Sequence, residues 1–249
     1  LWGLFMKKSL LTALLVACSM YSQAQAETLK FGTEATFAPF EFTDNKSEVI
    51  GYDADIIRAI GEVEGFEVQI VNQPFDALIP GVLTKQLDGA IAAITITEER
   101  AKQVAFSDPY YKAGINAVIR REDGLKYLTL ESLKDKRLCA QIGTTGANVA
   151  KHFSKNVGEY NTVPDAFMEL KTKGCEAVFN DRPVNLYFLI TKKDDSFVEV
   201  PELYNGEEYG IVVSKKNPEL VKRLNSGLKK IRDNGTFAKI HKKWFNTEE

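Results

Sequence analysis

Hydrophobic and polar positions follow two periods that alternate along the chain. Residues 28–33 and 66–71 are β-type runs, and the second alternates with the period of two that is typical of a strand. Between them, residues 52–64 place Ile56 and Ile60 on one face, with the period near 3.6 of an amphipathic helix. Strands that alternate with helices predict an α/β protein with a mostly parallel sheet and helices on both faces.

The same alternation continues and then restarts as a second α/β unit. The first unit goes on with a helix at 76–85, a strand at 88–94 and a short helix at 97–104. The second unit has strands at 136–141, 160–163 and 175–179, and helices that end near 153 and span 164–173 and 183–190. The chain closes with a strand at 209–214, a helix at 218–232 and another helix after the turn at 233–237.

A strand and a long helix after the second unit indicate that the chain returns to the first. This return predicts two lobes joined by two crossings. Lobe 1 is expected to comprise residues 27–110 with 210–249, and lobe 2 residues 115–204. Residues 111–114 and 205–209 are then the hinge.

Composition narrows the class of function. The chain has 249 residues, 44% apolar residues and a net charge of −2, without a basic stripe that would indicate nucleic acid. Gly-x-Ser-x-Gly, a P-loop and a dinucleotide fingerprint are all missing from the sequence, which disfavours several enzyme classes. The histidines, His152 and His241, stand in lysine-rich settings and are expected on the surface, so no metal site is predicted.

The first 26 residues have the order of a secretory signal peptide. Basic residues after Met6, an apolar run and Ala24-Gln25-Ala26 predict cleavage after Ala26 and a periplasmic protein. Residues 1–5 are interpreted as a gene-model artefact. The alternative is a lipoprotein anchored at Cys18.

Three junctions between a strand and a helix carry candidate binding residues. Thr95 follows a strand and Arg100 lies in the next helix, where a guanidinium can hold a carboxylate with two parallel hydrogen bonds. Gln141 to Gly146 offers a second turn with free N–H groups. Asp181 ends a third strand, at the edge where α/β proteins bind ligands. The structural alternatives are a surface pair of Arg100 with a neighbouring glutamate, an ordinary capped helix, and a helix cap ahead of Pro183.

Motifs of one known family are spread over residues 28–247. They are GTEATFAPFEF (32–42), GYDADI (51–56), ITITEER (94–100), FSDPYY (106–111), QIGTTG (141–146), VFNDRP (178–183) and KKWF (242–245). Together they resemble the periplasmic polar amino-acid-binding proteins of ABC importers, of the glutamine, arginine or lysine-arginine-ornithine type. The resemblance implies a two-lobed, type II Venus-flytrap fold without cofactor or catalytic residue. It also implies a monomer that closes on one free amino acid and delivers it to an inner-membrane permease.

The resemblance also implies a role for each site residue. Arg100 would bind the α-carboxylate, helped by Thr95 and by the backbone of Ala93 and Thr145. Asp181 would bind the α-ammonium group, with Thr95 and the Ala93 carbonyl. Phe37 and Phe75 would enclose the ligand side chain between their rings. Glu34 and Gln141 would meet the far end of that side chain. Ala92, Thr144 and Asn180 are the remaining expected binding residues.

The far end of the expected pocket indicates the ligand. Glutamine binders of this family usually carry Asp, Lys and His where this chain has Glu34, Gln141 and Asn180. An acid between two aromatic faces suits a guanidinium or ammonium group, so arginine is expected first, lysine or ornithine second and glutamine third. A dehydratase on the same fold and a surface sensor or adhesin are the competing classes.

Two cysteines remain in the mature chain. In an exported protein Cys139 and Cys175 are candidates for a disulfide, with two buried thiols as the alternative. Related general amino-acid binders have a bond at comparable places, so the resemblance implies that these cysteines are paired.

Overall fold

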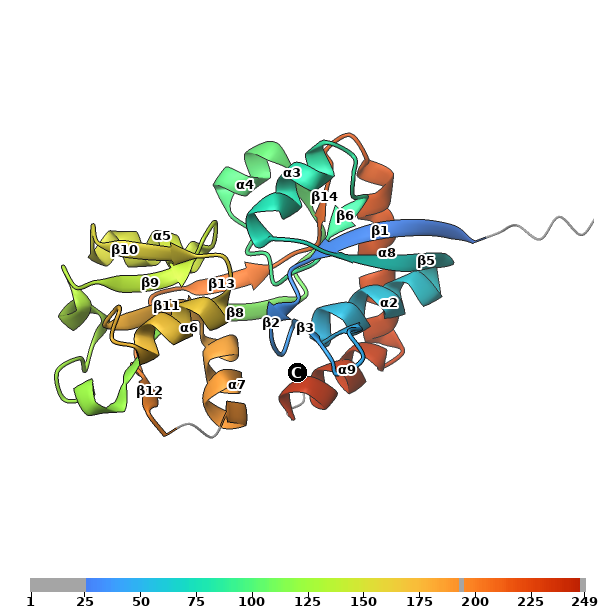
Figure 1. The fold of residues 1–249 in the computed structure, drawn as a ribbon. Helices are drawn as coiled ribbons and strands as arrows, with labels where there is room; N and C mark the ends of the chain where they lie inside the picture. The colour runs from blue at the N-terminus through green and yellow to red at the C-terminus, as the bar shows by residue number, and fades with distance from the viewer. Residues whose placement is uncertain (1–25, 193–194, 247–249) are drawn as a thin grey trace, which may run out of the picture.

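The chain forms two α/β lobes that lie side by side, in a computed structural model that describes residues 26–192 and 195–246 (Figure 1). The predicted signal peptide and its alternative anchor Cys18 fall outside the described residues, apart from Ala26. Within the described ranges, no helix is both long and apolar enough to cross a membrane.

The first lobe is built on a sheet with the strand order β5-β1-β6-β14-β7. Its strands are β1 (Glu27–Thr33), β5 (Phe66–Asn72), β6 (Gly89–Ala90), β7 (Ala105–Phe106) and β14 (Val212–Val213). A small antiparallel sheet follows β1 and consists of β2 (Thr36–Phe37), β3 (Glu41–Thr43) and β4 (Val49–Ile50). The last strand of the chain, β14, thus lies between two strands from its first half.

The second lobe is built on a sheet with the order β10-β9-β11-β8-β12, and β13 pairs with β8 beyond this path. Its strands are β8 (Tyr111–Arg120), β9 (Leu138–Gln141), β10 (Val157–Tyr160), β11 (Ala177–Asp181), β12 (Phe197–Glu199) and β13 (Gly206–Tyr209). The antiparallel pair β8 and β13 crosses between the lobes (Figure 1).

The prediction of a mostly parallel sheet is confirmed for strand direction, because four of the five strands along each sheet path run the same way and one crossing strand, β14 or β8, runs against them. In each lobe the strands that follow one another through helices pair in parallel, such as β1 with β5 and β9 with β10. The strands that come from the crossings pair antiparallel, such as β14 with β6 and β8 with β11. A crossing strand enters each sheet from the opposite end, which reverses its direction.

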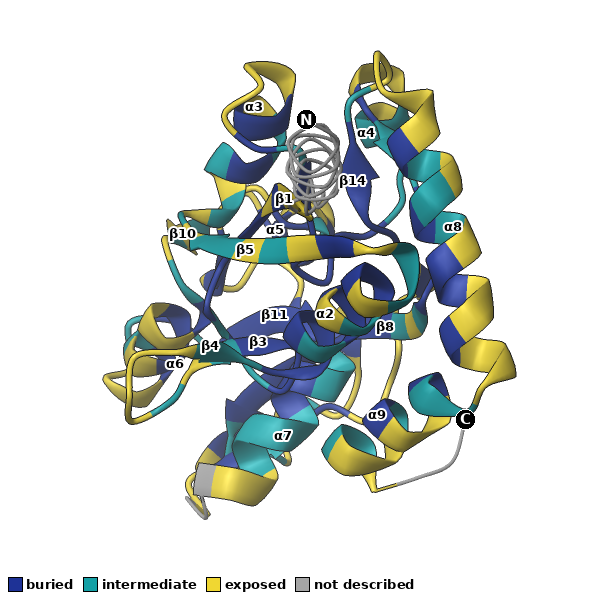
Figure 2. Cartoon of the chain, turned by 90° about the vertical axis from the view of Figure 1, so that its right-hand side faces the viewer, coloured by how far each residue is buried: buried dark blue, intermediate teal, exposed yellow. Residues whose placement is uncertain are grey.

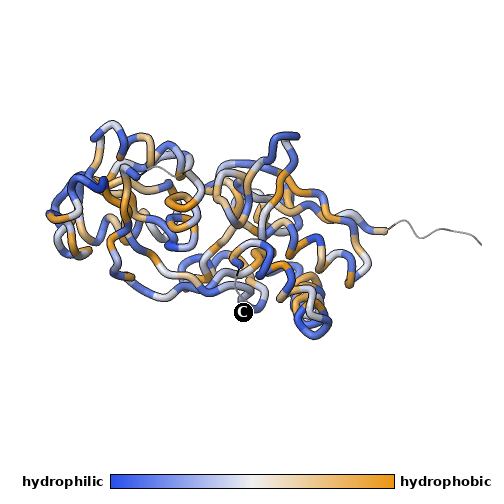
Figure 3. The backbone as a smooth tube through the Cα atoms, turned by 90° about the horizontal axis from the view of Figure 1, so that it is seen from below, coloured by the Kyte–Doolittle hydropathy of each residue, from blue (hydrophilic) through white to orange (hydrophobic). Residues whose placement is uncertain are grey.

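Helices cover both lobes and present buried and exposed faces in turn (Figure 2). In the first lobe they are α2 (Tyr52–Glu64), α3 (Leu78–Leu83), α4 (Glu98–Gln103), α8 (Pro218–Asp233) and α9 (Thr236–Phe245), with a 3-10 turn at Phe75–Ala77. In the second lobe they are α5 (Thr145–Phe153), α6 (Val163–Lys171) and α7 (Arg182–Lys192), with 3-10 turns at Arg121–Asp123 and Leu130–Leu133. Hydrophobic and hydrophilic stretches alternate along the chain of both lobes (Figure 3).

Local patterns in the sequence predict helix α2 correctly and one strand wrongly. The helix predicted at 52–64 is confirmed as α2, and Gly65, with a φ of 73°, ends it in the left-handed conformation. The strand predicted at 160–163 is wrong, because β10 ends at Tyr160 and α6 begins at Val163. Thr162 is the N-cap of α6, since its hydroxyl accepts the backbone N–H of Asp165.

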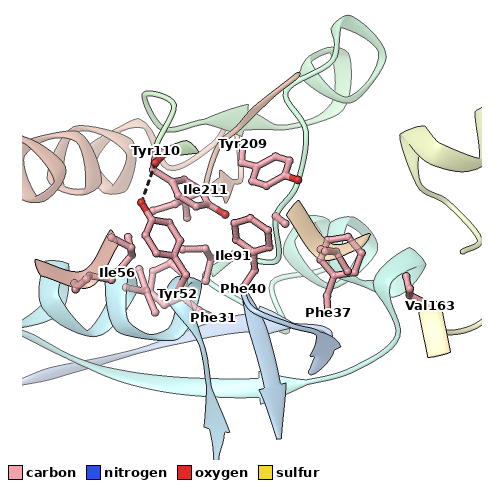
Figure 4. Packing of buried hydrophobic residues seen from close by; sticks show 14 of the residues in the cluster. Phe31, Phe37, Phe40, Tyr52, Ile56, Ile91, Tyr110, Val163, Tyr209 and Ile211 are labelled. Carbon is pink, nitrogen blue, oxygen red and sulfur yellow. Dashed lines mark hydrogen bonds between the residues drawn. The ribbon is translucent and has the colours of Figure 1, made fainter. Parts of the chain in front are cut away.

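An aromatic cluster packs beneath the crossing strands (Figure 4). Phe40 is fully buried, and its ring centroid lies 4.9 Å from that of Tyr111 and 5.2 Å from that of Tyr209. Tyr111 and Tyr209 face each other across the β8–β13 pair. His241 stacks on Tyr111 at 6.1 Å and is half-buried, so the prediction of a surface position is wrong for His241 and confirmed for His152.

The predicted disulfide between Cys139 and Cys175 is confirmed, with the two Cα atoms 6.1 Å apart. Cys139 lies in β9, and Cys175 lies just before the neighbouring strand β11. The bond therefore links adjacent segments inside the second lobe.

Candidate functional site

A small cavity lies where the two lobes meet beside the crossing strands. Its empty volume is about 260 Å³, and its lining comes from both lobes: Phe37, Phe75, Ala92, Ala93, Thr95, Arg100, Gln141, Thr144, Thr145 and Asp181. The structure thus brings together most of the residues predicted for the site. Their contacts with a ligand stay a prediction.

Arg100 spans the cavity from one lobe to the other. Its Nη1 donates to the carbonyl of Thr95 at 2.9 Å, and its Nη2 donates to the carbonyl of Gly143, in the second lobe, at 3.0 Å. The guanidinium carbon also lies 5.5 Å from the ring centroid of Phe75. Burial lowers the pKa of Arg100, while Asp181 and Glu207 act in the opposite direction. The guanidinium thus points into the site and not toward the glutamates of its own helix.

Asp181 supplies the negative charge opposite Arg100. It ends β11, is buried, and accepts a hydrogen bond from the hydroxyl of Tyr209 on its Oδ2. Burial, reinforced by Glu207, raises the pKa of Asp181 to about 7, while Tyr209 and Arg100 favour its ionised form. A cation brought next to this carboxyl would stabilise its ionised form further.

Glu34 and Gln141 meet at the other end of the cavity. Gln141 Nε2 donates to Glu34 Oε2 at 3.2 Å and to the Asn161 carbonyl at 2.9 Å. The hydroxyl of Thr36 donates to Glu34 Oε1 at 2.7 Å. Burial raises the pKa of Glu34, and these hydrogen bonds oppose the rise. Glu34 lies behind the lining, adjacent to Gln141.

The backbone of Ala93 is turned into the left-handed region, with a φ of 46°. Its N–H donates to Asp53 Oδ2 at 2.7 Å, and Tyr110 donates its hydroxyl to the same oxygen at 2.7 Å. Burial raises the pKa of Asp53 to about 6. The N–H of Ala93 is therefore already donated to Asp53. This corrects the expectation that the backbone of Ala93 helps to bind an α-carboxylate, and it leaves only the Ala93 carbonyl for a ligand.

Thr144 and Asn180 serve the local structure. The hydroxyl of Thr144 donates to the Gln141 carbonyl at 2.7 Å and accepts the Ala147 N–H at 3.1 Å, so it caps α5. Asn180 does not line the cavity, and its amide donates to Asn185 Oδ1 at 3.3 Å. Thr144 lines the cavity as well, so its contact with a ligand stays a prediction.

Glu207 is a buried acid that sequence reasoning missed. It lies in β13, and its Oε2 accepts the hydroxyls of Thr95 at 2.8 Å and Thr145 at 3.1 Å. Alternation along β13 buries Glu207 and Tyr209 and exposes Gly206 and Glu208. This period of two places both residues on the inward face, but two identical acids stand side by side in the sequence, so the sequence alone does not show which of them faces inward.

A larger groove lies on the other face of the crossing strands. It has an empty volume of about 960 Å³ and is lined mainly by apolar side chains of α7 and α9, among them Tyr187, Ile190 and Trp244. The smaller cavity is the better candidate, because buried charges of both signs converge on it and buried charges are costly without a functional or structural partner.

Comparisons with known proteins identify the family. Residues 29–247 match the model of the bacterial extracellular solute-binding proteins, family 3. The ABC transporter arginine-binding protein 1 of Escherichia coli is 33% identical over 246 residues, which cover 96% of this chain and 99% of that protein.

Solved structures give the same picture. An ancestral arginine-binding protein bound to arginine is 39% identical, with a TM-score of 0.83 over 88% of this chain and 98% of the other. A structure of an ancestral arginine-binding protein bound to glutamine is 38% identical, with a TM-score of 0.83 over 90% of this chain and 100% of the other.

Proposed function

The chain belongs to the bacterial extracellular solute-binding proteins of family 3, and we propose that it captures a free L-amino acid for an ABC importer. One observation carries the proposal: Arg100 from the first lobe and Asp181 from the second line one small cavity. A zwitterion that leaves water needs a partner for each of its charges, and this pair supplies both. The proposal includes no catalytic step.

Arg100 would bind the α-carboxylate by exchanging partners. Its two terminal nitrogens now donate to the carbonyls of Thr95 and Gly143. A carboxylate would offer the same two nitrogens a charged acceptor each. Because Gly143 belongs to the second lobe, the exchange releases one hydrogen bond between the lobes. A ligand that contacts Arg100 of the first lobe and Asp181 of the second at the same time would replace it and so favour the closed arrangement over an open one.

We propose arginine as the preferred ligand, lysine or ornithine next, and glutamine third. The cavity region holds the acids Glu34, Asp181 and Glu207 against the single cation Arg100, so a ligand with a net positive charge balances it best. Phe37 and Phe75 line the cavity, and their aromatic faces suit a flat guanidinium. Of the relatives named above, one is named as an arginine-binding protein, and ancestral arginine-binding proteins are solved with arginine and with glutamine, which supports both amino acids as candidates.

Lobe limits and cellular location remain part of the proposal. The antiparallel pairing of Tyr111 with Tyr209 and of Gly114 with Gly206 supports a hinge at 111–114 and 205–209. We propose that the protein acts as a monomer in the periplasm after cleavage behind Ala26, with lipid anchoring at Cys18 as the alternative.

A thermal-shift screen of the purified protein against the free amino acids, followed by calorimetry, tests the proposal. At a hundred times its dissociation constant, arginine is expected to stabilise the fold by about 2.7 kcal/mol. Arg100→Ala is the matched variant, in which no amino acid should raise the melting temperature. A wild-type protein that responds to no amino acid would contradict the proposal, and a larger response to glutamine than to arginine would reverse the ligand order.

A further inference from the structure

The side chains of Thr95, Thr145 and Glu207 meet at one point of the cavity wall. Glu207 Oε2 lies 2.8 Å from Thr95 Oγ1 and 3.1 Å from Thr145 Oγ1, and the two hydroxyl oxygens lie 3.5 Å apart. Thr95 belongs to the first lobe, Thr145 begins α5 of the second, and Glu207 comes from the crossing strand β13. Both threonines line the cavity.

This contact is set up by long-range backbone pairing. Thr95 and Tyr209 form an antiparallel bridge, the N–H of Ile96 donates to the carbonyl of Glu208 at 2.8 Å, and the N–H of Gly210 donates to the carbonyl of Ile94 at 3.1 Å. The segment after β6 is therefore held alongside β13. Alternation along β13 then turns Glu207 toward the threonine pair and Glu208 away from it.

A carboxylate controls the direction of these hydrogen bonds. A hydroxyl has one hydrogen to donate and two lone pairs to accept with, whereas a carboxylate oxygen only accepts. Each threonine hydroxyl must therefore donate its single hydrogen to Glu207. What each hydroxyl can still offer to the cavity is a lone pair, so both act as acceptors.

We infer that Glu207 is a positioning residue that makes Thr95 and Thr145 a pair of acceptors for the α-ammonium group of the ligand. With the carboxyl of Asp181, which lines the same cavity, they complete a set of acceptors suited to a group with three donors. The inference rests on the proposed function. It reassigns the hydroxyl of Thr95 from the α-carboxylate, which has no hydrogen to offer, to the ammonium group alone.

A purely structural role for Glu207 leads to a different prediction. If the acid only links the two lobes and β13, its loss weakens binding of every ligand by a similar factor, because closure is equally impaired for all of them. If it sets the direction of the threonine hydroxyls, its loss affects only ligands that carry an ammonium group at this place.

The test uses Glu207→Leu with three ligands. Both hydroxyls donate to the same oxygen of Glu207, and leucine removes this acceptor, so that each threonine is free to turn its hydrogen toward the ligand. The ligands are L-arginine, agmatine, which lacks the carboxylate, and 5-guanidinopentanoate, which lacks the ammonium group. Affinities come from calorimetry, with competition against arginine for the weaker ligands. The neighbouring exposed Glu208→Leu is the matched control and should change none of them.

The expected result is a loss of roughly tenfold or more for arginine and agmatine, with 5-guanidinopentanoate changed by less than about twofold. Equal losses for all three ligands, or no loss for arginine, would overturn the inference. If Glu207→Leu does not fold, Thr145→Val removes one acceptor directly and must show the same selectivity. A wild-type protein that does not bind arginine at all contradicts the proposed function instead, so the two failures are distinguishable.

Discussion

The two ends of the cavity are built from different parts of the fold. The hinge end consists of Thr95, Arg100, Thr145, Asp181 and Glu207, which stand beside or on paired strands. The Glu34 end consists of Glu34, which follows β1, Phe37, which ends β2, and Gln141, which ends β9 of the second lobe.

Under the proposed function, the hinge end would recognise the groups that all amino acids share, and the Glu34 end the side chain that distinguishes them. At the hinge end each polar side chain is held by a group from the opposite lobe or the crossing strands, as Asp181 is by Tyr209. At the Glu34 end the acid is held by Thr36, two residues along the chain, and by the amide of Gln141 from the second lobe. A change of Glu34 therefore disturbs one local hydrogen bond and one between the lobes.

Asp181→Asn should have the largest effect, and it should not discriminate between amino acids. Removing the charge next to the proposed α-ammonium position is expected to cost about 3 kcal/mol, roughly a hundredfold in affinity, for arginine and glutamine alike. Calorimetry with both ligands measures it. Loss of arginine binding alone would break the division between the two ends.

The same variant should change how stability depends on pH. The pKa of Asp181 is raised to about 7, from about 3.9 in an unfolded chain, so ionising this carboxyl opposes folding. Its contribution to stability is complete below the unfolded value and is lost as the pH rises through about 7. Without ligand, the melting temperature of Asp181→Asn should therefore fall less between pH 5 and 8 than that of the wild type. Calorimetric scans at both pH values check this, and parallel falls would contradict it.

Glu34→Gln should have a smaller and selective effect. The amide keeps the shape of the side chain but loses the charge that would pair with a guanidinium, so arginine affinity should fall roughly tenfold. Glutamine affinity should stay within about twofold, because its side chain brings no charge to this end. Titrations with both ligands give the ratio. An unchanged ratio would remove Glu34 from the choice of ligand.

Thr36→Val should have the smallest effect, visible mainly at low pH. The hydroxyl of Thr36 opposes the rise in the pKa of Glu34 that burial causes, so its loss should raise that pKa further. Arginine affinity, which needs the ionised acid, should then begin to fall at a higher pH than in the wild type. The expected loss is roughly threefold near the pKa. Coincident pH profiles of the two proteins would rule the coupling out.

The sequence predicts those parts of the site that carry their own local signal. Arg100 and Asp181 stand next to strand ends, and Thr144 begins a helix, so each could be placed without knowledge of distant contacts. Glu207 and Tyr209 could not, because they reach the cavity only through the bridge to Thr95. The N–H of Ala93 was assigned wrongly for the same reason, since its partner Asp53 is 40 residues away in the chain.

Prediction of the fold from the sequence has the same limit, because it also depends on local signals. Helix α2 has a clear apolar face and a terminal glycine, and its bounds were predicted as the structure has them. The mixed order of the sheets depends on which end a returning strand enters, which no local period encodes.

The position of β14 has a consequence for how the protein is made. It lies between β6 and β7, so the first sheet has no continuous order until residues 212–213 exist. The strands of the second lobe from β8 to β12, and its disulfide, need nothing beyond Glu199. As the exported chain folds, the interior lobe can form while the N-terminal lobe still has an open sheet edge. Completion of that edge by the returning chain is then also the step at which the two lobes acquire their second connection.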